Sequence, residues 1–393
     1  MYVCEGNALI YLDNSATTRP FDSVIDVMSA CMRETYFNPS AAYKPAVDVD
    51  REMRACRKRI AAQLGAQEDE ILFTSGGTES DNLAILGFAE TLRPDCGANF
   101  VCSAIEHPAV SETIRRVEKL GIEVRVLPID HRGVVDLAAA EDVIDEKTAL
   151  VSCMQVSNET GAIQPIEALS ALAHGKNPKV RVHVDGVQGF MRVPMHMGRM
   201  GVDMYALSGH KIHGPKGVGA LAVRKGVRLV PQMTGGGQEK NLRSGTYNAP
   251  AILGLGQAVA QMAENGDRME QLRAMKLRLW QQLSAIEGVR VNGPMPDEAD
   301  AAPHILSVFF DGVRGEVMRN ALEGAGVLVS TGSACASHKQ KVSATLRAMG
   351  LTGEQADGTI RISLGLLNTM DEMDEAAARM KETAALLARY RRR

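Results

Sequence analysis

Short apolar runs alternate with longer amphipathic segments between about residue 70 and residue 225. The apolar runs have the length of buried strands, and the segments between them carry apolar residues at helical spacing. This alternation predicts an α/β fold in which helices cover both faces of a mainly parallel, seven-stranded sheet. The predicted strands are EILFT, ANFVCSA, IEVRVLPI, TALVSCMQV, VRVHVDG, DMYALSG and GALAVRK.

A second, smaller α+β domain is predicted after residue 258. The segment 257–287 has a helical pattern that is broken only at Asn265-Gly266, so it can connect two domains. The chain of 393 residues is also longer than one hydrophobic core usually serves. We therefore predict a large domain over residues 15–258 and a small domain formed by residues 1–14 together with residues 259–393.

The composition changes this picture little. Hydrophobic residues make up 45% and charged residues 23% of the chain, and the formal net charge of -3 gives no electrostatic reason to expect nucleic acid or a membrane surface as partner. Neither a signal-peptide pattern nor a long apolar span is apparent. The seven cysteines form no CxxC pair, which suits reduced thiols better than a disulfide or zinc framework. We expect a cytoplasmic enzyme without a metal.

Polar residues follow several of the predicted strands. Ligands of open α/β sheets bind beyond the carboxyl ends of the strands, so these positions are candidates for a site. After the first strand, a glycine pair and a threonine open a helix whose free N–H groups favour a phosphate, although such residues are also ordinary helix caps. An Asp at a strand end can likewise simply cap a turn. The candidates are Gly77, Thr78, His107, Asn158, Asp185 and Gln188.

Lys211 follows a predicted strand and lies beside Ser208 and His210 in a glycine-rich turn. Desolvation and cationic neighbours lower the pKa of an ammonium group, and the neutral amine can then form a Schiff base with an aldehyde. Taken alone, the segment fits a solvated or phosphate-binding lysine equally well. Together with an upstream Asp, a glycine-rich helix start and a ring for stacking, it predicts a site for pyridoxal 5'-phosphate (PLP).

The chain resembles the cysteine desulfurases of the NifS and IscS type, within the class V aminotransferase-like fold of PLP enzymes. The resemblance runs nearly from end to end, with its motifs in the family's order. These motifs are YLDNSATT, FTSGGTESDN, EHPAV, NETG, HVDGVQ, SGHKIHGPKGVGAL, GGGQEKNLRSGT, STGSACASH and RISLG. The resemblance implies the aspartate aminotransferase-like fold, with PLP in the large domain and a catalytic cysteine loop in the small one.

The resemblance implies roles around the cofactor ring. Lys211 would hold PLP as a Schiff base and later remove the substrate's Cα proton. Asp185 would pair with the pyridine nitrogen, and Gln188 would bond the ring hydroxyl. His107 would stack on the ring and move protons.

It also implies how the charged ends of the cofactor and the substrate are bound. The phosphate would be bound by Gly77, Thr78, Ser208 and His210. Thr246 would reach the phosphate site of the neighbouring subunit, which implies a homodimer. The substrate's α-carboxylate would be held by Asn38, Asn158 and Arg361, because a guanidinium fork suits a carboxylate.

The implied reaction takes the sulfur of L-cysteine. Cys335 in STGSACASH would accept it as a persulfide, and L-alanine would leave. A thiolate needs an exposed, electropositive setting, to which His338 and Lys339 would contribute. By itself this stretch supports a structural loop cysteine equally well. The persulfide would pass to an acceptor protein, which is an iron–sulfur scaffold, a tRNA-thiolating enzyme or a cofactor-sulfurating protein.

Two stretches depart from the family's pattern. Tyr43 and Ala46 follow Asn38-Pro39-Ser40 in place of a histidine and a glycine, and Leu366-Leu367 stands where an Arg-Phe pair is common. These changes bear on substrate access and partner docking. One alternative function is another class V PLP enzyme, such as a selenocysteine lyase or an aminotransferase. The other is a silent scaffold that binds sulfur-assembly partners.

Overall fold

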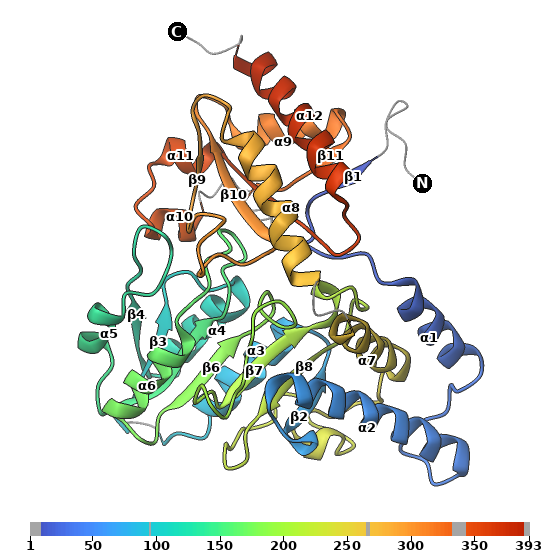
Figure 1. The fold of residues 1–393 in the computed structure, drawn as a ribbon. Helices are drawn as coiled ribbons and strands as arrows, with labels where there is room; N and C mark the ends of the chain where they lie inside the picture. Colours follow the sequence, from blue (N-terminus) through green and yellow to red (C-terminus); the bar gives the residue numbers. More distant parts are fainter. Residues whose placement is uncertain (1–8, 94–95, 265–267, 332–342, 389–393) are drawn as a thin grey trace.

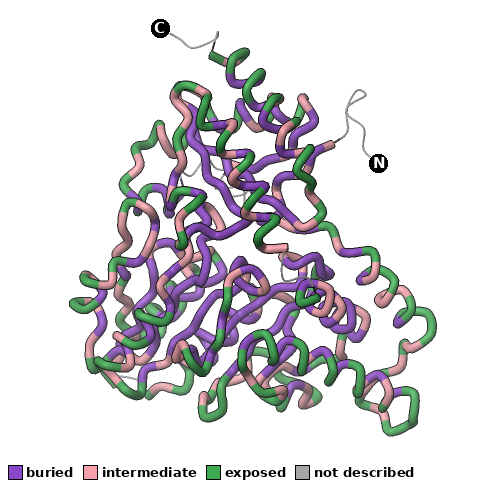
Figure 2. The backbone as a smooth tube through the Cα atoms, viewed as in Figure 1, coloured by how far each residue is buried: buried purple, intermediate pink, exposed green. Residues whose placement is uncertain are grey.

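The computed structural model describes residues 9–93, 96–264, 268–331 and 343–388. They form a large α/β domain and a smaller domain of sheets and helices that lies above it in Figure 1. Buried residues run through the centre of both domains and across their junction (Figure 2). Among the described helices, none is long and apolar enough to cross a membrane. The cysteines of the described part, Cys31, Cys56, Cys96, Cys102 and Cys153, are free thiols.

A seven-stranded sheet with the order β2-β8-β7-β6-β5-β3-β4 forms the centre of the large domain. Strand β8 is antiparallel to both of its neighbours, and the other neighbouring pairs are parallel. The prediction of a mainly parallel, seven-stranded sheet is therefore confirmed. The strands are β2 (Ile71–Thr74), β3 (Asn99–Ser103), β4 (Glu123–Leu127), β5 (Thr148–Met154), β6 (Arg181–Asp185), β7 (Met204–Ser208) and β8 (Gly219–Val223).

Each face of this sheet has its own hydrophobic core. Along β7, Met204 and Ala206 belong to one core, whereas Tyr205 and Leu207 belong to the other. Successive side chains of a strand point to opposite faces, and a sheet covered on both faces needs apolar residues at every position. This is why the strands appear in the sequence as unbroken apolar runs.

Helices cover the two faces. The Met204 side packs on α3 (Gly77–Ala89) and α4 (Pro108–Lys119). The Tyr205 side is covered by α2 (Lys44–Leu64), α5 (Leu137–Val143), α6 (Ile166–Lys176) and α7 (Ala249–Ala263). Helix α1 (Asp22–Arg33) packs on α7, and α1 and α2 project from the edge of the domain (Figure 1). Three short 3-10 turns are η1 (Glu68–Glu70), η2 (Gly209–Lys211) and η3 (Glu239–Asn241).

The small domain contains an antiparallel sheet of order β12-β10-β9. Its strands are β9 (Val289–Val291), β10 (Ile305–Phe310) and β12 (Thr359–Ser363), and its helices are α8 (Arg268–Leu283), α9 (Gly315–Gly324), α10 (Ala344–Ala348), α11 (Gly353–Asp357) and α12 (Met370–Ala388). Near the start of the chain, β1 (Ile10–Tyr11) pairs in parallel with β11 (Val327–Leu328). The first described residues therefore join the small domain.

The predicted boundary at residue 258 falls inside α7. This helix continues to Ala263, and Ala258, Val259 and Met262 are all buried in the core of the large domain. Because one helix face stays packed on α1 and α2 along this length, the chain leaves the large domain only after α7 ends. The expected break at Asn265-Gly266 lies outside the described residues.

Helices α2 and α7 approach closely where Gly256 faces Cys56. A Cβ atom on Gly256 would lie 2.2 Å from the Cys56 Sγ atom and 2.8 Å from its Cβ atom. Gly256→Ala should therefore force the helices apart and lower the free energy of unfolding by about 1–3 kcal/mol. Gly175→Ala, in α6, is the control, because no atom lies within 4 Å of its added Cβ. There we expect a gain of about 0.5–1 kcal/mol, measured by urea unfolding.

Candidate active site

A cavity of about 300 Å³ lies beyond the carboxyl ends of the sheet strands, at the junction with the small domain. Arg361 reaches it from β12 of the small domain, and Ser15 and Ala16 reach it from the N-terminal segment. Most of the residues that the sequence indicated line this one cavity. They are Gly77, Thr78, His107, Asn158, Asp185, Gln188, Ser208, His210, Lys211 and Arg361.

Three of the predicted residues are not placed in this cavity. Cys335 lies outside the described residues. Thr246 is exposed in the loop between η3 and α7. Asn38 is also exposed, in the connection between α1 and α2, and its Oδ1 atom accepts a hydrogen bond of 3.0 Å from the backbone N–H of Ser40. Asn38 therefore does not line the cavity of its own chain, because the connection between α1 and α2 lies at the edge of the domain. Its role toward the substrate's carboxylate stays a prediction.

Lys211 is held at both its backbone and its amine. It follows β7 in the short η2 turn, and its Nζ atom donates to the backbone oxygens of Ser15 (2.6 Å) and Ala16 (2.9 Å). The guanidinium of Arg192 donates to the carbonyl oxygen of Lys211. Arg192 is buried, and this burial lowers its pKa to about 10. The contacts fix the direction in which the amine faces the cavity.

Asp185 and His107 are the buried acid and base of the cavity. Asp185 ends β6, and its Oδ1 atom accepts a hydrogen bond of 2.9 Å from the backbone N–H of Val187. Burial raises the pKa of Asp185 and lowers the pKa of His107. The Nδ1 atom of His107 accepts from the backbone N–H of Ala109 at 3.1 Å, so the neutral ring carries its proton on Nε2.

The part of the cavity formed by the start of α3 is suited to a phosphate. Gly77 and Thr78 form the first turn of α3, where free backbone N–H groups favour an anion. A Cβ atom on Gly77 would lie 2.5 Å from Cγ2 of Val187, so the close approach of these segments requires glycine. Burial and the neighbouring Lys211 lower the pKa of His210 to about 4, which makes this ring a neutral hydrogen-bonding group.

Gln188 has its amide orientation fixed by two neighbours. Its Nε2 atom donates to the backbone oxygen of Ser15 at 3.0 Å, and its Oε1 atom lies 3.4 Å from Nε2 of His304. The backbone oxygen of Ser15 can only accept, so the amide nitrogen of Gln188 faces it and the amide oxygen faces His304. The Nε2 atom of His304 must therefore carry the proton that it donates to this oxygen. Burial, together with the positive charge of Arg192, holds the pKa of His304 well below its usual range. Gln188 therefore has a second N–H available for a ligand.

Arg361 connects the two domains. It donates to the backbone oxygen of Asn158 (2.9 Å) and to Oδ1 of Asp13 (2.8 Å). Its buried Nε atom has no hydrogen-bond partner among the described residues. The same holds for Oγ of Ser15, which also lines the cavity. These unpaired polar atoms and the donors at the start of α3 fit a polar ligand with anionic groups at its ends, as PLP and an amino acid have.

Sequence reasoning missed Arg192, His304, Asp81 and Glu106. Glu106 stood in the EHPAV motif without a role, and His304 was a single histidine at the start of an apolar run. The Oε1 atom of Glu106 accepts from the Ser103 hydroxyl and from the Met154 backbone N–H. Its pKa is raised to about 8 by burial, and the nearby Asp185 adds to the shift. Glu106, in its neutral form, thus connects the ends of β3 and β5 next to His107.

Comparisons with known proteins agree with this arrangement. Residues 10–375 match the family model described as aminotransferase class-V. The chain is 39% identical to a protein named cysteine desulfurase IscS from Methanosarcina thermophila, over 94% of this chain and 92% of that protein. A protein of the same name from Escherichia coli O139:H28 is 40% identical over 93% and 90% of the two chains.

Two solved structures are similar along nearly their whole length. One, titled NifS-like protein, has a TM-score of 0.90 and 37% identity, and the match covers 96% of this chain and 100% of that one. The other, titled SspA in complex with cysteine, has a TM-score of 0.79 and 33% identity, with coverages of 92% and 100%. Both similarities extend across the two domains that form the cavity.

The raised pKa of Glu106 predicts a pH-dependent stability. The folded protein keeps a proton on Glu106 up to a pH of about 8, whereas the unfolded chain releases it near the ordinary value of 4.5. The contribution of protonated Glu106 to the free energy of unfolding is therefore complete below about pH 4.5 and is lost as the pH rises to about 8. Glu106→Gln keeps both hydrogen bonds without the titration. It should gain stability relative to the wild type by up to about 1.4 kcal/mol per pH unit across this interval.

Thermal unfolding of the cofactor-free proteins at several pH values measures this effect. Glu112→Gln is the control, since Glu112 lies exposed on α4 and pairs with Arg115 on the surface. Its melting curve should shift with pH in parallel with that of the wild type. Parallel shifts for Glu106→Gln as well would contradict the prediction.

Proposed function

Because the chain belongs to the class V aminotransferases and, within them, to the cysteine desulfurases of the NifS and IscS type, we propose that it takes sulfur from L-cysteine with PLP as its cofactor. The products are L-alanine and a persulfide on Cys335. One observation carries the proposal: a single cavity brings together Lys211, Asp185 and His107 beyond the strand ends, with Arg361 reaching in from the other domain.

The residues of the cavity would hold the cofactor by its ring and its phosphate. PLP, when bound, supplies an electron sink for the electron pair that the substrate's Cα gives up. Asp185 would face a protonated ring nitrogen, whose positive charge stabilises the buried carboxylate. Gln188 would donate its second amide hydrogen to the ring hydroxyl. The phosphate would be bound by Gly77, Thr78, Ser208 and His210.

The substrate's carboxylate would be bound where the two domains meet. The unpaired Nε–H of Arg361 is a donor for it, and the contacts of this side chain with Asp13 and the Asn158 backbone keep the guanidinium in place. The amine of Lys211, held beside Ser15 and Ala16, would take the proton from the substrate's Cα. His107, neutral and with its proton on Nε2, would hold or pass a proton above the ring.

Cys335 would carry out the sulfur transfer. Its thiolate attacks the sulfur of the bound cysteine, an S–S bond forms, and the Cβ–S bond breaks with its electron pair left on carbon. That carbon takes up a proton, Cα regains the proton that it gave to the amine of Lys211, and the substrate leaves as L-alanine. This role follows from the STGSACASH motif, since Cys335 lies outside the described residues.

The proposal extends to the partners of the enzyme. The persulfide would pass to an iron–sulfur scaffold or a tRNA-thiolating enzyme. Thr246, exposed on its own subunit, would complete the phosphate site of a second subunit in a homodimer. Reduced thiols suit work in the cytoplasm, and the cysteines of the described part are free. A selenocysteine lyase is the alternative, because the cavity would bind either amino acid.

Incubation with L-cysteine tests the proposed reaction. The wild type should form alanine and a peptide containing Cys335 that is heavier by one sulfur atom in mass spectrometry. Cys335→Ala should bind PLP normally but lose at least about 100-fold in alanine formation, because no thiolate accepts the sulfur. Lys211→Ala should lose alanine formation and the covalent attachment of PLP.

Cys96→Ala is the control, since Cys96 is an exposed free thiol remote from the cavity. A Cys335→Ala protein that turns over cysteine at the wild-type rate would refute the sulfur-transfer role. Selenocysteine assayed in parallel separates the two functions: if only selenocysteine is turned over, the enzyme is a lyase.

A further inference from the structure

The loop that carries Thr246 begins with a strained turn. Glu239, Lys240 and Asn241 have φ values of 49°, 57° and 64°, in the left-handed region that residues other than glycine seldom adopt. Three such residues in succession persist only where the surrounding structure holds them. This conformation therefore calls for a strong local anchor.

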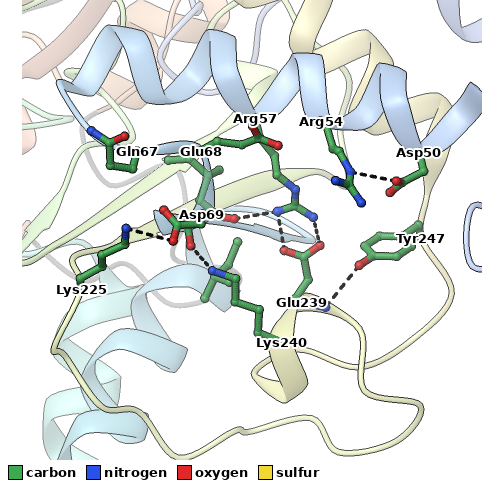
Figure 3. Close-up of a pocket in the computed structure, with 12 residues that line it drawn as sticks. Asp50, Arg54, Arg57, Gln67, Glu68, Asp69, Lys225, Glu239, Lys240 and Tyr247 are labelled. Atoms are coloured by element: carbon green, nitrogen blue, oxygen red, sulfur yellow. Dashed lines mark hydrogen bonds and ion pairs between the residues drawn. The ribbon is translucent and has the colours of Figure 1, made fainter. Parts of the chain in front are cut away.

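A buried ion pair provides the anchor. The guanidinium of Arg57, on α2, forms two hydrogen bonds with the Glu239 carboxylate (Figure 3). The same guanidinium donates to the backbone oxygen of Ile71 (2.6 Å), and Oε2 of Glu239 accepts from the backbone N–H of Phe73 (2.9 Å). Only 1% of the Glu239 side chain and 15% of the Arg57 side chain are exposed. Glu239 is thereby fixed to both α2 and β2.

A second ion pair anchors the loop nearer to Thr246. Nε of Arg243 lies 2.7 Å from Oε1 of Glu79, in the first turn of α3, and Oε2 of Glu79 accepts from the backbone N–H of Ser75. The amide oxygen of Gln238 also accepts from the backbone N–H of Gly245 (2.9 Å). The loop is thus connected to the turn that forms the predicted phosphate site, yet Thr246 stays exposed.

The cavity beside this loop does not resemble a ligand site. It measures about 580 Å³, and charged residues of both signs line it. Arg54 pairs with Asp50 (2.9 Å) and Lys225 with Asp69 (3.3 Å), as Figure 3 shows. The charges that line the cavity thus neutralise one another in pairs within the chain. The unusual feature of this region is instead the strained loop that the two ion pairs hold.

We propose that Arg57 and Glu239 are positioning residues for the cofactor site of the partner subunit. Their ion pair holds η3 in its left-handed conformation, and this presents Thr246 on the outside of its own subunit at the place where a partner's phosphate site would receive it. The inference rests on the proposed homodimer and adds which residues fix the shared loop. A merely structural ion pair would instead affect the subunit that contains it.

Single variants test the strength of the effect. Glu239→Gln removes the charge and one strong acceptor, so the dissociation constant for PLP should rise at least 10-fold. Arg57→Lys keeps the charge but loses the bidentate contact with Glu239. It replaces Glu239→Gln as the test variant if that protein does not fold. Arg54→Gln is the matched control from the same cavity and should bind PLP as the wild type does. Unchanged PLP affinity in folded Glu239→Gln or Arg57→Lys would overturn the proposal.

Heterodimers with different tags show in which pocket the effect arises. In one, Glu239→Gln sits on the subunit with Lys211, and the partner carries Lys211→Ala. Borohydride reduction fixes PLP only on the Lys211-bearing chain, where mass spectrometry counts it. This pocket receives an intact loop and should bind PLP with wild-type affinity. When both substitutions are on the partner, the wild-type chain's pocket receives the altered loop and should bind PLP at least 10-fold more weakly.

The opposite pattern, with weak binding only when Glu239→Gln lies on the Lys211-bearing chain, would overturn the inference. Thr246→Val in the same two arrangements tests the homodimer proposal itself. If Thr246→Val weakens the partner's pocket and Glu239→Gln does not, the positioning role fails and the shared phosphate site stands. If Thr246→Val weakens only its own chain's pocket, the shared site fails, and the inference fails with it.

Discussion

The burial of charged groups at the ends of the parallel strands is the constraint on which this structure depends. A charge removed from water is unfavourable unless hydrogen bonds or an opposite charge compensate it. Lys211 meets this requirement through the backbone oxygens of Ser15 and Ala16, and Asp185 meets it in part through the backbone N–H of Val187. Burial raises the pKa of Asp185, so a positive group bound in the cavity would stabilise its carboxylate.

The small domain is needed to create that burial. The first described residues join the small domain at β1, the chain then passes along the cavity at Ser15 and Ala16, and the large domain follows. Contacts between distant segments hold the junction, among them Arg361 with the backbone oxygen of Asn158 and His304 with Gln188. The cavity is therefore a property of both domains, and side chains from either one set the orientation of groups on the other.

The same principle operates at the edge of the large domain, where Arg57 and Glu239 are buried against each other and hold three left-handed residues. At the cavity and at this loop alike, a buried charged side chain bonds to backbone groups and so holds the backbone in one conformation. Glu106 shows the alternative solution, because burial raises its pKa so far that the neutral form accepts and keeps its hydrogen bonds. An ionised pair fixes the loop at the domain edge, whereas Glu106 behind β3 keeps its hydrogen bonds in the neutral form.

The amino-acid sequence determined the strands, their mainly parallel order and the residues that follow them. These are local properties: a strand buried on both faces must be apolar throughout, Asp185 ends one such strand, and Lys211 lies in the short turn that follows another. The roles of Arg192, His304 and Glu106 were beyond its reach, because each depends on contact with a residue far away in the chain or on burial. The exposed position of Asn38 and the burial of Ala258, Val259 and Met262 in the large domain depend on packing between helices in the same way. Helix packing decides where a helix ends and what it carries away from a site, and packing exists only once the chain has folded.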